Sequence, residues 1–280
     1  MPDASFRGIS GAPLEWLKAA RDLRTPENTL RVRATVLRRL IEAKINPLTA
    51  TADQIDAWWL DLAREGLAPK TMSTYRAELR AFYAWAVAYD RVKVSPARRV
   101  PSVKIPERLY DAPPRAEVLQ LYAYAEEHDP VMYRAFVLAA AGGLRAAETA
   151  VLAWARVNVA GQIIRVIGKG DKERAVDFGR ASLERLGEPC DPGWSVITRS
   201  VNFLTPNAVS KRASRVIRAA GLDFTLHGLR HFHGVTAYQN AGKDLDAVRR
   251  HLGHTNPATT LIYAKAAPEA GRKLADATDL

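Results

Sequence analysis

The sequence predicts a mainly α protein with a small β-hairpin sheet, built as two domains. Apolar residues recur at helical spacing over most of the chain, which indicates amphipathic helices. One β-branched run, 162–167, is followed by a glycine-containing turn and a second short run at 174–177, which predicts a hairpin. The stretch 100–114 holds four prolines and no apolar period, as is typical of a stiff linker.

We therefore expect a helical domain at 1–104, a Pro-rich linker at 105–114 and a second domain at 115–280 that ends in a tail helix. A chain of 280 residues is long for one hydrophobic core and suits two. We find no internal repeat and no low-complexity segment.

Four helices are expected in the first domain. A short one lies around Leu14–Leu23, and Thr25 is the expected N-cap of the next because Pro and Glu follow it. Thr51 and Gln54 form a capping box that opens the third helix. The fourth starts near Pro69, and its aromatic residues at helical spacing are expected in the core.

The second domain begins with two helices, continues with the hairpin and ends with four more helices. The helices are expected at 115–127, 131–141, 206–220, 225–240, 244–252 and 256–266.

The chain is basic, with a formal net charge of +11 at pH 7. Lys and Arg exceed Asp and Glu in both halves of the chain. This indicates a polyanionic partner, in the first place nucleic acid, which need not contact one domain alone. The alternative is a basic charge that serves solubility alone.

The single cysteine, Cys190, excludes an intramolecular disulfide and suits a reducing compartment. The amino terminus has no basic-then-apolar signal pattern, and the longest apolar stretch, Ala135–Leu144, is too short to span a bilayer. We expect a cytoplasmic protein that does not enter a membrane.

Two arginines, a lysine, two histidines and a tyrosine in the second half form one chemical set. Its members are Arg145, Lys169, His227, Arg230, His254 and Tyr263. In phosphodiester cleavage, negative charge grows on the non-bridging oxygens, where preorganised arginines can hold it. A general acid protonates the leaving oxygen, and a tyrosine can attack phosphorus without a metal and retain the phosphate.

The segments around these residues resemble the tyrosine recombinases, the phage integrase family, and the resemblance runs from about residue 12 to the end of the chain. The family motifs fall on Gly143-Leu144-Arg145, Gly168-Lys169-Gly170, His227-Gly228-Leu229-Arg230 and Leu252-Gly253-His254, with Tyr263 nine residues later. One position departs: Gly142 stands where the family often has Thr, which does not touch the chemistry.

The resemblance implies a helical core-binding domain of the SAM-like kind, followed by a mixed α/β tyrosine-recombinase catalytic domain. The two clamp double-stranded DNA, and four protomers pair two sites. Because this chain starts close to the core-binding helices, we expect a simple recombinase without an additional arm-binding domain.

The resemblance also implies a role for each member of the set. Tyr263 is the nucleophile that becomes linked to a DNA 3′ phosphate and frees a 5′ hydroxyl. Arg145 and Arg230 hold the non-bridging oxygens, and Lys169 protonates the leaving 5′ oxygen. His254 bonds the phosphate.

His227 is implied to assist proton transfer and positioning. Glu148 lies three residues after Arg145 and so shares its helix face, which makes it a candidate orienting partner for Arg145 or a histidine.

Two other interpretations of these segments are weaker. His227, His231 and His233 could suggest a metal site, but position 228 is Gly where a zinc-protease helix needs Glu. The Gly-Lys-Gly at Lys169 lacks the order of a phosphate-binding loop and opens no helix. We expect no metal and no cofactor.

Additional DNA contacts are expected from two basic helix faces. One is near the start of the fourth helix and the other lies after Thr205: Lys70, Thr71, Arg76 and Arg80, then Lys211, Arg212 and Arg215. The alternative for each is a charged face that is merely solvated.

The expected function is site-specific DNA recombination or integration by strand cleavage and rejoining through a 3′-phosphotyrosine and a Holliday junction, without metal or ATP. The resemblance implies a homo-tetramer on paired DNA sites, such as a mobile genetic element uses, and leaves accessory directionality or host factors open. Two alternatives stay open: DNA relaxation by a type IB topoisomerase-like enzyme, and a DNA-binding protein without catalysis.

Overall fold

The computed structural model describes residues 6–106, 112–168, 173–240, 242, 244–253 and 258–265. The chain divides into two compact units, Met1–Glu107 (unit 1) and Arg108–Leu280 (unit 2). The expected linker falls partly on 107–111 and the expected tail helix falls on 266–280, which lie outside the described residues.

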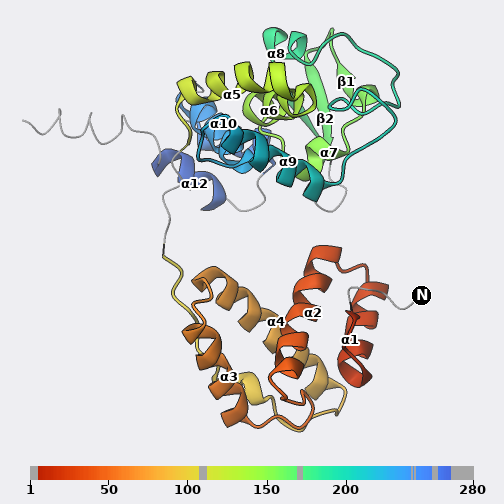
Figure 1. The fold of residues 1–280 in the computed structure, drawn as a ribbon, viewed down its shortest axis with the longest axis vertical. Helices are drawn as coiled ribbons and strands as arrows, with labels where there is room; N and C mark the ends of the chain where they lie inside the picture. Colours follow the sequence, from red (N-terminus) through yellow and green to blue (C-terminus); the bar gives the residue numbers. More distant parts are fainter. Residues whose placement is uncertain are drawn as a thin grey trace, which may run out of the picture. The chain divides into compact units, whose positions relative to one another are not determined.

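Unit 1 is helical (Figure 1). Its elements are α1 (Gly11–Asp22), α2 (Glu27–Glu42), α3 (Ala52–Arg64), α4 (Pro69–Ala88) and the short 3₁₀ helix η2 (Pro96–Arg99). Trp58, Trp59 and Phe82 are buried in its core, as predicted, and Trp85 packs partly buried against it.

Helix starts in unit 1 follow the sequence in one case and depart from it in another. Thr51 and Gln54 form the predicted capping box, with the Gln54 amide donating to Thr51 Oγ1 at 3.2 Å. The prediction that Thr25 caps α2 is wrong, because Pro26 occupies that position. The Thr25 amide instead donates to the Ala20 carbonyl at 3.0 Å and closes the turn that leaves α1.

Unit 2 combines helices with a three-stranded antiparallel sheet in the order β1-β2-β3. The helices are α5 (Arg115–His128), α6 (Pro130–Gly142), α7 (Ala146–Ala150), η3 (Trp154–Arg156), α8 (Arg180–Glu184), α9 (Pro206–Ala219), α10 (Leu226–Asn240), α11 (Leu245–Leu252) and α12 (Ala258–Lys265). The strands are β1 (Val157–Asn158), β2 (Ile163–Ile167) and β3 (Glu173–Asp177).

The predicted fold class, mainly α with a small hairpin sheet, is confirmed. Strands β2 and β3 form the predicted hairpin, with Ile163 opposite Asp177 and Ile167 opposite Glu173. Strand β1 adds a third strand through Val157 and Ile164, which the sequence did not predict because a strand of two residues shows no alternation.

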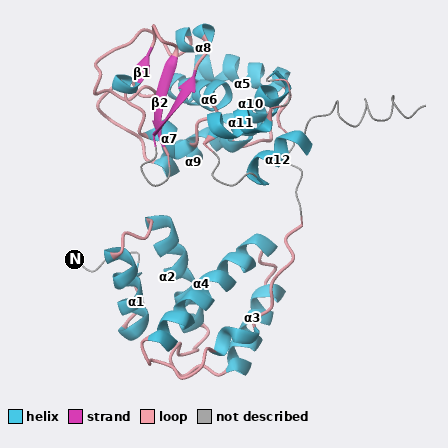
Figure 2. Ribbon diagram, turned by 180° about the vertical axis from the view of Figure 1, so that it is seen from behind, coloured by secondary structure: helices cyan, strands magenta, loops and turns pink. Residues whose placement is uncertain are grey.

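Helix α6 lies at the centre of unit 2. Residues 135–140 are all buried, and α6 packs against α5, α9 and α10. Figure 2 shows the three strands together on one side of the unit, beside these helices. At the carboxyl end of α6, Gly142 lies against Phe178 just after β3, and the Gly143 carbonyl accepts a hydrogen bond from Arg230 of α10.

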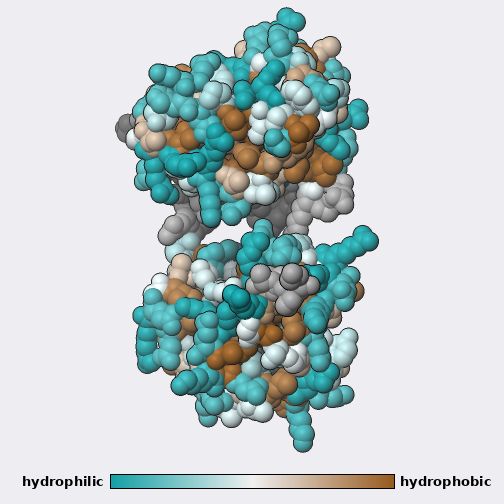
Figure 3. All heavy atoms as spheres, turned by 45° about the vertical axis from the view of Figure 1, so that its right-hand side comes forward, coloured by the Kyte–Doolittle hydropathy of each residue, from teal (hydrophilic) through white to brown (hydrophobic). Residues whose placement is uncertain are grey.

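The face of each unit seen in Figure 3 is mostly polar with scattered apolar areas. No helix within the described ranges is long and apolar enough to cross a membrane.

Candidate active site

A glycine turn presents the first predicted catalytic arginine. Gly143 follows α6 with φ of +63°, and a Cβ there would lie 2.5 Å from Leu252 Cδ2 and 2.9 Å from His233 Cδ2. Both the backbone conformation and the close approach require glycine. The turn places Arg145 immediately before α7, at the N-cap position.

Arg145 is held by Glu148. Its backbone N–H donates to Glu148 Oε2 at 2.8 Å, and its Nη1 donates to Oε1 at 2.9 Å. The Arg145 side chain is 38% exposed, whereas that of Glu148 is 4% exposed. The carboxylate is thus an internal anchor, and the remaining guanidinium nitrogens of Arg145 stay available to a ligand.

A second arginine, Arg174 of β3, shares the same carboxylate. Its Nη1 and Nη2 donate to Glu148 Oε1 and Oε2 at 2.8 and 3.0 Å. Sequence analysis missed this residue. The signal was the period-two alternation of β3, which puts Arg174 on the same face as the buried Val176.

The two arginines keep Glu148 ionised. Burial would raise the pKa of this carboxyl, but the hydrogen bonds from Arg174 and from the Arg145 amide, together with the two positive charges, outweigh burial and hold the pKa below its usual range.

Arg230 of α10 is almost completely buried, at 1% exposure. Its Nη1 donates to the Gly143 carbonyl and its Nη2 to the Leu252 carbonyl at 2.7 Å. Burial, and next the charge of Arg145, lower its pKa to about 10, which still leaves the guanidinium protonated at neutral pH. Arg230 therefore joins the ends of α6 and α11 and adds a second fixed positive charge.

Tyr263 of α12 is buried, at 1% exposure, with its ring against Gly234 of α10. Burial raises the pKa of the Tyr263 phenol, and the charges of Arg230 and Arg145 oppose that rise. These interactions bring the predicted nucleophile to the two predicted phosphate-binding arginines.

His227 and His231 lie one helical turn apart on α10, with ring centroids 4.6 Å apart. Partial burial, followed by the charges of Arg230 and Arg145, lowers the pKa of His227. Burial, followed by His227, lowers the pKa of His231 to about 4. The His231 ring lies 5.9 Å from the Tyr263 ring, centroid to centroid.

Two predicted catalytic residues, Lys169 and His254, lie outside the described residues. The chain on either side is described: β2 ends at Ile167 and β3 begins at Glu173, while α11 ends at Leu252 and is followed by Gly253 at φ of +63°.

Among the residues that the structure describes, no cluster of three or more His, Cys, Asp or Glu side chains could hold a metal ion.

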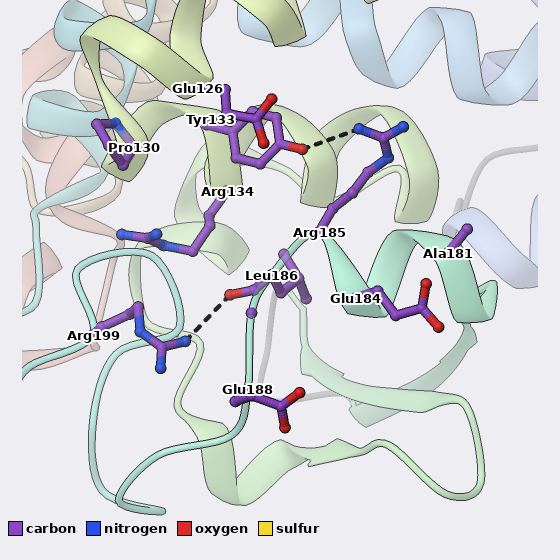
Figure 4. Close-up of a pocket in the computed structure, with 11 residues that line it drawn as sticks. Glu126, Pro130, Tyr133, Arg134, Ala181, Glu184, Arg185, Leu186, Glu188 and Arg199 are labelled. Carbon is purple, nitrogen blue, oxygen red and sulfur yellow. Dashed lines mark hydrogen bonds between the residues drawn. The ribbon is translucent and has the colours of Figure 1, made fainter.

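A hollow of about 770 Å³ lies elsewhere on unit 2, between α6 and the segment around α8 (Figure 4). Its lining includes none of the predicted catalytic residues that the structure describes, namely Arg145, His227, Arg230 and Tyr263. Arg185 donates to Tyr133 Oη at 3.0 Å and Arg199 to the Leu186 carbonyl at 3.3 Å, so its arginines bond to the protein itself.

The predicted DNA-binding residues on α4 differ in their surroundings. Lys70 and Arg80 are exposed, and Thr71 is half-buried. Arg76 is half-buried and donates through Nε to the Val100 carbonyl at 2.9 Å, so it ties α4 to the end of unit 1.

The predicted set on α9 shows the same division. Lys211 and Arg215 are exposed. Arg212 instead donates to both oxygens of Asp129 at 2.7 and 2.8 Å, and Asp129 caps α6. Lys211 and Arg215 are thus the members of this set that face solvent.

Comparison with known proteins gives consistent matches. The model of the phage integrase family matches residues 114–270. A tyrosine recombinase XerC from Proteus mirabilis is 30% identical over 254 residues, which cover 85% of this chain and 82% of that protein. A XerC from Pediococcus pentosaceus is 31% identical over 253 residues, covering 79% of this chain and 83% of that protein.

The fold matches solved structures of lambda integrase. A fragment in a dimer bound to a COC′ core site superposes with a TM-score of 0.76 at 18% identity, covering 92% of this chain and 95% of that one. A lambda integrase tetramer bound to a Holliday junction gives a TM-score of 0.73 at 19% identity, covering 88% and 77%. At such identities the likeness concerns the fold alone.

Proposed function

We propose that Tyr263 is the nucleophile of this chain. The chain belongs to the phage integrase family and is a site-specific tyrosine recombinase that cleaves and rejoins DNA. The observation that supports the assignment of the nucleophile is the packing of the Tyr263 ring against Gly234 on α10, the helix that carries Arg230, where the charges of Arg230 and Arg145 lower the pKa of the phenol against the effect of burial. Two such cations stabilise a phosphate under attack, since guanidinium groups remain charged and bind its oxygens in pairs.

In the proposed reaction the Tyr263 oxygen attacks a DNA phosphorus, and the bond from phosphorus to the 5′ oxygen breaks. The 3′ phosphate stays on the tyrosine and a free 5′ hydroxyl leaves. A 5′ hydroxyl from a second duplex then attacks the phosphotyrosine and releases the enzyme. One phosphodiester replaces another, so the cycle needs no ATP.

Arg145 and Arg230 bind the two non-bridging oxygens in this scheme. The carbonyls of Gly143 and Leu252 orient the Arg230 guanidinium, and Glu148 orients that of Arg145.

Proton transfer is assigned to the remaining members of the set. Lys169 protonates the leaving 5′ oxygen, His254 donates to the phosphate, and His227 assists proton transfer near Tyr263. A neutral His227 can accept a proton at neutral pH, because its pKa lies below the usual histidine value.

Double-stranded DNA is the proposed substrate, acted on by four copies of this chain on two paired sites. The lambda integrase tetramer on a Holliday junction, which shares the fold, supports this arrangement. Lys70, Thr71 and Arg80 on α4, and Lys211 and Arg215 on α9, are the proposed backbone contacts. Arg76 and Arg212 support these helices from within the protein.

The test uses a plasmid that carries the DNA flanking the gene, incubated with purified protein in EDTA and stopped with SDS. Native protein should remain covalently attached to DNA and Tyr263→Phe should not. Covalent adduct with both proteins would show that a residue other than Tyr263 is the nucleophile. Absence of adduct with native protein on intact and nicked DNA would refute cleavage.

A further inference from the structure

Arg174 joins three segments that hold proposed catalytic residues. It lies on β3, opposite Val166 of β2 and five residues after Lys169 in the sequence. Its side chain is 13% exposed, so it is an internal group rather than a surface cation. One guanidinium reaches both the start of α7 and the end of α11.

At α7, Arg174 completes the bonding of Glu148. Each carboxylate oxygen accepts one hydrogen bond from Arg145 and one from Arg174, at 2.8 to 3.0 Å. Without Arg174 the buried carboxylate would have Arg145 as its sole described cation, and the attraction would draw that guanidinium inward.

At α11, the Arg174 Nε donates to the His251 carbonyl at 3.2 Å. The last carbonyls of a helix lack partners within the helix, and a cation there is favourable. The Arg174 Cδ also stands 3.0 Å from where a Cβ on Gly253 would lie. Strand β3 is therefore fixed to His251 and Gly253, which immediately precede His254 in the sequence.

We propose that Arg174 is a positioning residue for strand cleavage: it neutralises Glu148, so that Arg145 keeps its free nitrogens for the phosphate, and it fixes β3 to the end of α11. The proposal rests on the function proposed above. Lysine cannot replace this arginine, because an ammonium lacks the planar fork that reaches Glu148 and the His251 carbonyl together.

The test compares Arg174→Lys with native protein in single-turnover cleavage of a nicked substrate at saturating protein. The rate of adduct formation should fall by about 10²-fold, as small misplacements of catalytic groups do, with the DNA dissociation constant unchanged. Arg165→Lys is the matched control, since Arg165 lies on the same hairpin with its side chain 70% exposed.

A double-mutant cycle with Glu148→Gln tests the route of action. The double variant should cleave no more slowly than the slower single variant, because both changes break one network. Independent, multiplied losses would overturn the proposal. So would an unchanged rate in Arg174→Lys, or a loss confined to DNA affinity.

Hydrogen exchange gives a readout that needs no cleavage. The Arg145 amide, bonded to Glu148, should exchange at least tenfold faster in Arg174→Lys and at the native rate in Arg165→Lys, with both variants retaining the native melting temperature within a few degrees. An unchanged exchange rate of the Arg145 amide in Arg174→Lys would overturn the positioning role, whether or not native protein forms an adduct. Absence of adduct with native protein would refute the proposed function instead.

Discussion

The phenol ring of Tyr263 lies against the Cα of Gly234, where a Cβ would stand 2.4 Å from ring atoms Cε1 and Cζ. The residue at position 234 on α10 therefore constrains where Tyr263, the proposed nucleophile on α12, lies, since real Cβ atoms do not approach carbon so closely.

Gly234→Ala should displace Tyr263 and reduce covalent adduct formation by about 10²-fold or more, because a shift of 1 Å in a reacting group has that effect. Gly228→Ala is the control on the same helix, where the added Cβ meets its nearest atom at 3.4 Å. Equal adduct yields from the two variants would show that the Gly234 contact does not place the nucleophile.

Arg230→Lys should cleave about 10² to 10³-fold more slowly while binding DNA with nearly native affinity. The buried guanidinium donates to two carbonyls and holds a fixed charge, and an ammonium cannot do both. Single-turnover cleavage and a fluorescence binding titration measure the two quantities. A parallel loss of affinity would instead identify Arg230 as a general DNA contact.

Glu148→Gln should lower the free energy of unfolding at neutral pH by about 3 kcal/mol, because the largely buried Arg174 is then left without its counter-charge. The native carboxyl has a lowered pKa, so its contribution is present above the usual carboxyl pKa and disappears as pH falls through the folded value. Urea unfolding at neutral pH and at about pH 3 should show the difference between the two proteins shrinking in acid. A constant difference would contradict the ionised pair.

The lowered pKa of His233 should reduce the free energy of unfolding in mild acid. Burial, and next His251, lower the pKa of His233 from 6.5 to about 4. The unfolded chain then binds more protons between these values, so stability falls as pH falls through that window, by about 3 kcal/mol at most. His233→Asn should flatten the dependence of urea unfolding on pH, and His128→Asn, at an exposed site, should not. An unchanged slope in His233→Asn would rule out this residue as the cause.

Much of the helical order could be predicted from sequence, because caps and periodicity are local. Thr205 caps α9 through the Ala208 amide at 3.2 Å, as its position before Pro206 indicates. Thr25 is not the cap because α2 begins at Glu27 with Pro26 as its N-cap, one residue later than the local pattern indicates. Helices α7 and α8, of five residues each, are too short to show a period.

Part of the candidate site could likewise be predicted from the sequence, and part could not. Motif spacing identified Arg145, Arg230 and Tyr263, and the structure brings these three together. Arg174 was missed because its meaning depends on Glu148, which is 26 residues away in the chain. The ion pair between Arg212 and Asp129, which are 83 residues apart in the chain, could not be predicted either. Ion pairs of this kind depend on tertiary structure, which helical periodicity does not encode.

The most direct test of the central claim is to identify the residue joined to DNA. Native protein is trapped on a nicked substrate, digested with protease and nuclease, and analysed by mass spectrometry for a peptide that bears a nucleotide remnant. We expect one modified peptide, with the remnant on Tyr263 and attached through a DNA 3′ phosphate. A remnant on another residue, or attachment through a 5′ phosphate, would contradict the claim.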